Sequence, residues 1–115
     1  MFVGHEKEVK GTVIEGRGIR NVVKKALIGP REGWTGWVMR TFTLGKEGFT
    51  PRHRHSWPHI NYVLDGRGVL FLDGKEHQVE RGSIAFIPGN AEHQFMNTGE
   101  KDLVFICIVP EEGDA

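Results

Sequence analysis

The 115-residue sequence has little cysteine, no net charge and no long apolar run, and each shortage excludes a class of protein. Cys107 is the single cysteine, so an intrachain disulfide framework is excluded. Lysine plus arginine and aspartate plus glutamate both number 15, which removes the electrostatic basis for binding nucleic acid or an anionic membrane surface. No apolar run approaches bilayer-spanning length, and the first residues become charged too early for a signal peptide. A cytoplasmic protein with no nucleic-acid or membrane partner is therefore expected.

Amphipathic helical spacing is also missing, because the apolar residues alternate or form short blocks between turn signals. The pattern predicts strands at Val22–Ile28, Trp37–Leu44, Ile60–Leu64, Val69–Leu72, Glu76–Val79, Ser83–Ile87, His93–Asn97 and Leu103–Val109. Turns are indicated between them, among others at Gly45–Gly48 and at Asp73–Gly74, where a tight hairpin turn needs positive φ. This regular alternation of short strands and turns predicts an all-β, antiparallel sandwich or barrel. The chain is long enough for one core.

Four histidines have the spacing of one metal site. His53 and His55 lie two residues apart, so both imidazoles leave the same face of an extended strand. His59 follows four residues later, and His93 comes after the turn signal Pro88–Asn90. Neutral imidazole is the commonest protein ligand for first-row metals, so these four side chains are predicted to surround one divalent ion. The alternative is that they are separate histidines on a solvated surface.

The segments 48–66 and 82–97 resemble the two motifs of the cupin family. The matching residues are Gly48, His53, His55, His59 and Gly66 in the first motif, and Gly82, Pro88, His93 and Asn97 in the second. Asn90 stands where glycine is usual, and asparagine tolerates the left-handed turn conformation better than most residues. The resemblance implies a double-stranded β-helix, or jelly-roll barrel, with the ion inside the barrel mouth. It implies a single cupin domain over residues 1–115.

One departure from the family motif carries chemical information. Many cupins have a glutamate where this sequence has His59, so the site resembles the four-histidine variant of small cupins that bind manganese and related metals. Because four histidine ligands are neutral, the site keeps the full double positive charge of a divalent ion. If the ion is six-coordinate, about two of its coordination positions stay free for other ligands. Manganese is the first expectation and iron the second. Copper, nickel and zinc stay open, because nitrogen ligands favour them by intrinsic affinity.

The resemblance also indicates a substrate pocket beside the metal. Its candidate residues are Arg40, Trp57, Phe95, Phe105 and Cys107. Phe105 and Cys107 share one face of the last strand, and Phe95 shares a face with His93. Three of the five have a plainer alternative: Cys107 as a small buried hydrophobe, Arg40 in a surface ion pair, and Trp57 against a neighbouring chain.

Three functions are compatible with these residues. The first is a metalloenzyme that performs an oxidative, dioxygenase-like reaction on a small oxygenated organic substrate, with no general base identified in the sequence. The second is a non-redox isomerase or decarboxylase that uses the ion as a Lewis acid. The third is a cupin that binds a small molecule without turnover. A homodimer is expected, with apolar N-terminal residues such as Val13 and Ile14 forming a strand lent to the partner.

Overall fold

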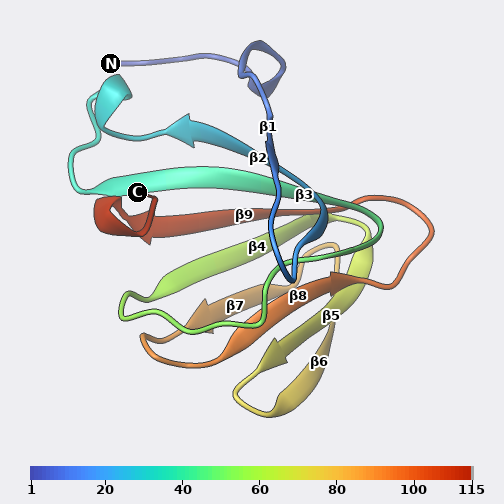
Figure 1. Ribbon diagram of the computed structural model, residues 1–115. Coiled ribbons are helices and arrows are strands. Elements are labelled where there is room, and N and C mark those ends of the chain that lie inside the picture. Colours follow the sequence, from blue (N-terminus) through green and yellow to red (C-terminus); the bar gives the residue numbers. More distant parts are fainter. Residues whose placement is uncertain (115) are drawn as a thin grey trace.

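The computed structural model describes residues 1–114, and almost all regular structure in it is antiparallel β-strand (Figure 1). The strands are β1 (Thr12–Ile14), β2 (Arg20–Ile28), β3 (Trp37–Phe49), β4 (His59–Asp65), β5 (Arg67–Leu72), β6 (Lys75–Glu80), β7 (Ile84–Ile87), β8 (His93–Asn97) and β9 (Leu103–Pro110). Three single-turn 3-10 helices accompany them: η1 (Glu6–Glu8), η2 (Pro30–Glu32) and η3 (Glu111–Asp114). All eight predicted strands are present, most with ends shifted by one or two residues, and β3 extends further, to Phe49.

The sheet runs in the order β6-β5-β8-β3-β9-β4-β7, with β2 and β1 following from β3 on a second path. Strand β3 connects the two layers of this curled sheet (Figure 1). It pairs with β9 from Trp37 to Leu44 and then reaches β8, where Phe49 pairs with Met96. Strands far apart in the sequence are thereby neighbours, which is typical of a jelly roll. The expected antiparallel jelly-roll barrel is confirmed.

The core lies inside the curl, and alternation along the strands selects its residues. In β9 every second residue is buried, so Phe105, Cys107 and Val109 share the inward face, as predicted. His59 and Asn61 alternate in the same way at the start of β4. The main core cluster consists of Val22, Leu44, Val63, Leu70, Val79, Ile87, Phe95, Leu103 and Phe105. The cavity beside the histidines, which is described below, adjoins this cluster.

Two turn predictions are confirmed and one is wrong. Asp73 and Gly74 have φ of 49° and 88° and close the β5–β6 hairpin, as a tight primed turn requires. Asn90 has φ of 68°, so it adopts the left-handed conformation expected of it. The turn expected at Gly45–Gly48 does not end a strand. Strand β3 continues through it as a bulge.

Glycine is required in that bulge by a close approach of backbones. Val22 pairs with Leu44 and Arg20 with Phe49, so four residues of β3 face the single residue Asn21 of β2. A Cβ on Gly48 would lie 2.8–2.9 Å from the carbonyl oxygens of residues 20, 21 and 45. The glycines that indicated a turn are therefore needed because the backbones are crowded at this point within a strand.

Two surface features concern association. Strand β1 pairs with β2 of the same chain, so the strand expected to be lent to a partner has a place in its own sheet. The outer face of β4, β7 and β9 is apolar, with a groove lined by Ile60, Tyr62, Ile84 and Phe86 among others.

Of residues 1–114, none forms a helix long and apolar enough to cross a membrane.

Candidate metal centre

Strand pairing brings the four predicted histidines to one end of the barrel. His53 forms an isolated bridge with His93, with backbone hydrogen bonds in both directions of 3.2 and 2.9 Å. The amide of Asn90 donates to the carbonyl of His55 at 2.6 Å, which ties the loop before β8 to the same segment. His59 begins β4, which is separated from β8 in the sheet by the two strands β9 and β3. Residues 40 positions apart thus face one another.

The imidazole nitrogens of three of the four histidines are close enough to share one ion. Ligand atoms of His53, His55 and His93 lie within 4.8 Å of one another, so these three could hold a metal. Nε2 of His59 lies 3.2 Å from Nε2 of His93, and the His59 ring centroid is 5.3 Å from that of His55. Two nitrogens at about 2.0–2.1 Å from a common ion are roughly 3 Å apart when they subtend a right angle. The observed spacing therefore fits a metal ligand set.

Hydrogen bonds at Nδ1 orient the rings so that Nε2 faces the space between the histidines. In three of the rings Nδ1 faces an oxygen two residues away: His55 to the Trp57 carbonyl at 2.9 Å, His59 to Asn61 Oδ1 at 2.7 Å, and His93 to the Ala91 carbonyl at 2.9 Å. These oxygens only accept, so each Nδ1 carries the hydrogen and each neutral ring keeps its lone pair on Nε2. Two such lone pairs 3.2 Å apart repel unless a cation lies between them.

Three of the histidines, His53, His59 and His93, have lowered pKa values and are neutral near neutral pH, as metal ligands must be. Burial, followed by the neighbouring charge of His93, lowers the pKa of His59 to about 3 against the partly opposing hydrogen bond to Asn61. Burial also lowers the pKa of His93, and burial together with His55 lowers that of His53. Protonation of these three rings therefore does not compete with metal binding at pH 7.

A cavity of about 280 Å³ opens beside the cluster, and all five predicted pocket residues line it. Phe95 and Phe105 stack with ring centroids 4.1 Å apart, and Trp57 stacks on His55 at 4.6 Å. Trp57 thus packs against a histidine of its own chain. The aromatic faces give the cavity an apolar wall next to the polar cluster.

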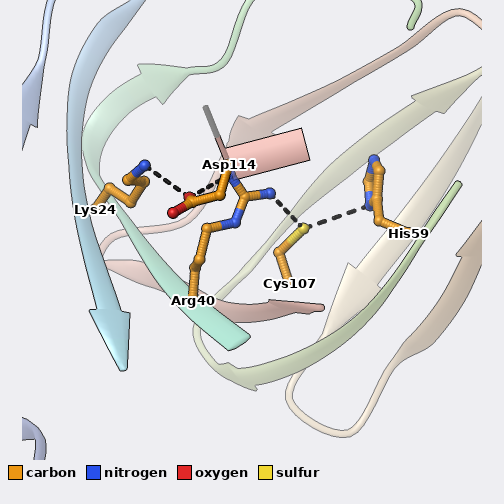
Figure 2. Close-up of polar contacts among 5 residues, drawn as sticks. All are labelled: Lys24, Arg40, His59, Cys107 and Asp114. Atoms are coloured by element: carbon orange, nitrogen blue, oxygen red, sulfur yellow. Dashed lines mark hydrogen bonds and ion pairs between the residues drawn. The ribbon is translucent and has the colours of Figure 1, made fainter. Parts of the chain in front are cut away.

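Arg40 and Cys107 lie on the cavity wall in a chain of polar contacts that ends at His59 (Figure 2). Nη2 of Arg40 donates to Cys107 Sγ at 3.1 Å, and Sγ lies 3.5 Å from Nδ1 of His59. Burial raises the pKa of the Cys107 thiol, the charge of Arg40 opposing this in part. Cys107 is a buried thiol and Arg40 a largely buried cation, with a side chain 11% exposed.

The sequence did not single out Lys24, Asn61 or Asp114. Asn61 could have been found, because it lies two residues beyond His59 and shares its strand face. Lys24 and Asp114 meet across 90 residues, and no local pattern indicates that. His77 is exposed on β6, and Arg52 and Arg54 alternate outward from the histidines.

Comparison with known proteins agrees with this architecture. The family model described as a cupin domain matches residues 40–109, more than half of the chain. The chain is a cupin. It is 39% identical to auxin-binding protein 1 of Arabidopsis thaliana in an 80-residue alignment that covers 62% of this cupin and 39% of that protein. It is 32% identical to the 1-methylthio-D-xylulose 5-phosphate methylsulfurylase of Rhodospirillum rubrum, covering 83% of this chain and 60% of that one.

The cupin is also similar to a solved structure. The polyketide cyclase RemF from Streptomyces resistomycificus superimposes with a TM-score of 0.88 at 29% identity, over 96% of this chain and 79% of that one. The cupin spans less than two thirds of the length of these curated relatives, 39% and 60% for the two above. These relatives have varied functions, so the family alone does not select a reaction.

Proposed function

We propose that this cupin is a metalloenzyme that oxidises a small oxygenated organic substrate in a dioxygenase-like reaction, with one divalent transition metal on His53, His55, His59 and His93. The observation that carries the proposal is the convergence of neutral imidazoles at one mouth of an aromatic cavity. Manganese is the proposed metal, followed by iron. Copper, nickel and zinc would also bind such nitrogen ligands.

The protein residues have defined parts in this chemistry. A bound divalent ion supplies Lewis acidity, redox capacity and about two open coordination positions. Asn61 and the two backbone carbonyls hold the ligand rings by accepting from Nδ1–H, as outer partners of metal ligands commonly do. Phe95 and Phe105 exclude water from the substrate space. Asp114, the carboxylate that pairs with Lys24 and Arg40 at the cavity wall, is held by these two cations, which supports a reaction that needs no carboxylate base.

The first experiment is elemental analysis with electron paramagnetic resonance on protein purified without a histidine tag or chelator. We expect about one manganese or iron ion per chain, strongly reduced in His59→Ala and unchanged in His77→Ala. His77 is the matched control because it is a histidine exposed on β6. Metal retained equally in both variants would refute the four-histidine set. With the loaded protein, oxygen uptake across a panel of small oxygenated compounds tests the reaction, and no uptake with any metal refutes it.

A second candidate is non-redox lyase or isomerase chemistry with the ion as Lewis acid. It is supported by the similarity to a methylsulfurylase and to a polyketide cyclase. Turnover that persists with zinc under anaerobic conditions would favour it over the oxidative reaction. The similarity to an auxin-binding protein keeps small-molecule binding without turnover as a third candidate, which stabilisation by a ligand without product would support.

The homodimer is also part of the proposal, through the outer face of β4, β7 and β9. Ile60, Tyr62, Ile84 and Phe86 are between 48% and 77% exposed there, which is costly for contiguous apolar side chains in water. The face is uncharged at these positions, so a second copy could pack on it without burying a charge. Light scattering should give twice the chain mass of 13.0 kDa, and a monomer would refute this. Cytoplasmic location stays a prediction.

A further inference from the structure

Two cations on the cavity wall share one oxygen of a single carboxylate. Lys24 Nζ lies 2.9 Å from Asp114 Oδ1, and Arg40 Nη1 lies 3.4 Å from the same atom. Figure 2 shows Asp114 between the two cationic side chains, with Cys107 and His59 beyond Arg40. The side chains of these three charged residues are between 11% and 23% exposed, so water screens the cluster only in part.

The cluster has an excess of positive charge and of hydrogen-bond donors. Two cations against one carboxylate leave a formal charge of +1. The guanidinium of Arg40 has five N–H groups, and a thiol is a weak acceptor for the Nη2 group that faces Cys107. Nε of Arg40 is buried, with no hydrogen-bond partner among the described residues. A carboxylate presented in the plane of the guanidinium would satisfy Arg40 better than the 3.4 Å contact to Asp114 does.

These cations belong to the same cavity as the histidines. Lys24 and Arg40 line the space of about 280 Å³ together with the histidine cluster and the ring of Phe42. The Arg40 guanidinium carbon lies 5.0 Å above that ring. A ligand with an apolar, planar body would therefore lie along the aromatic wall, with an anionic group at the cations and its other end toward the histidines.

Asp114 reaches the cations from a short segment that is lightly attached. Helix η3 has one turn and no buried residue. It is tied to the sheet by the Glu111 amide, which donates to the Gly36 carbonyl at 2.8 Å. Gly113 lies against Trp57 at the cavity, where an added Cβ would come within 2.7 Å of the indole nitrogen. Since η3 contains no buried residue, moving it aside would bring none of its own buried side chains into water and would free both cations.

We propose that Lys24 and Arg40 form a carboxylate-binding site for the substrate of this cavity, and that Asp114 occupies the site until the substrate replaces it. The inference rests on the proposed function in that it names the substrate class: a small organic acid with a planar apolar body. The carboxylate binds the cations by charge-assisted hydrogen bonds. The aspartate is an internal competitor, so the apparent affinity for every incoming acid is the intrinsic affinity multiplied by the fraction of time that the site is free.

The test is calorimetric titration of the full chain with benzoate and with its neutral counterpart benzamide, in the presence of a chelator. Without metal, a carboxylate has no ion to bind, so the result does not depend on whether the metalloenzyme proposal holds. We expect Asp114→Asn to bind benzoate about tenfold more tightly than wild type, which corresponds to a site that the aspartate holds nine-tenths of the time. Benzamide binding should not change.

Two further variants separate this site from a general charge effect. Glu112→Gln removes an exposed acid from the same η3 segment and should leave benzoate affinity at the wild-type value. Lys24→Met in the Asp114→Asn background should abolish the gain. The inference is overturned if Asp114→Asn gives no gain, if benzamide gains equally, or if Glu112→Gln gives the same gain as Asp114→Asn.

Discussion

The metal-free protein should lose stability on mild acidification, and His59 should account for much of the loss. Burial beside His93 lowers the pKa of His59 to about 3, whereas the unfolded chain has the ordinary value near 6.5. Between these two values the unfolded state binds a proton that the folded state does not. The free energy of unfolding therefore falls as the pH falls through 6.5, and continues to fall until about pH 3.

The size of the effect follows from that difference in pKa. At pH 5 the unfolded His59 is 1.5 pH units below its own pKa, which corresponds to about 2 kcal/mol at 1.36 kcal/mol per unit. His53 and His93, whose pKa values burial also lowers, act in the same direction. The pKa of Asp65 is lowered by Lys101, so its contribution is lost only at more acidic pH, which makes pH 5 a suitable lower limit.

Urea denaturation of the chelated protein at pH 7 and pH 5 measures this loss. His59→Gln removes the titrating ring, so the difference between the two pH values should shrink by about 2 kcal/mol relative to wild type. His77→Gln, at an exposed position, should leave the difference unchanged. The reasoning is refuted if wild type and His59→Gln lose equal stability between pH 7 and pH 5. Only the change with pH is compared, so an overall destabilisation of the variant does not affect the result.

Three other variants test the site, the core and the surface. Asn61→Ala removes the oxygen that accepts from His59 Nδ1, and manganese affinity measured by calorimetry should fall about 10–100-fold; unchanged affinity would contradict an orienting role. Asn97→Ala leaves three backbone carbonyls without their Nδ2 donor, so urea denaturation should show a loss of about 2–3 kcal/mol, and a neutral effect would mean that water replaces the amide. Phe86→Asp places a charge on the exposed apolar face of β7 and should yield a monomer in light scattering; a persisting dimer would place the interface elsewhere.

Much of the fold could be predicted from local patterns, because burial on a strand has a period of two. The alternation in Leu103–Val109 correctly indicated the inward face with Phe105 and Cys107. The hairpin at Asp73–Gly74 was equally local, since its positive φ angles are a property of those two residues. The Gly45–Gly48 segment was misinterpreted because glycine serves both turns and close backbone contacts. Its role depends on Arg20 and Asn21, which lie on another strand.

The candidate site likewise combines features that the sequence showed with features that depend on distant strands. The ligand residue types and their spacing were visible in the sequence, and so was the aromatic character of Phe95 and Phe105. The distance of 3.2 Å between His59 and His93 was not visible, because it depends on the register of strands 34 residues apart. The orientation of the His59 ring also depends on Asn61, whose amide is held by the Ile106 carbonyl of β9.

The sequence by itself determined the strands, the family and the candidate metal-binding side chains, because strand period, turn chemistry and ligand type are properties of short segments. Only the tertiary structure decided which groups meet. It placed Lys24 and Asp114 in one ion pair across 90 residues and turned Arg40 into the cavity beside Cys107. Such meetings arise from sheet closure and register, in which each strand is positioned by all its neighbours at once. No segment of the chain contains that information alone.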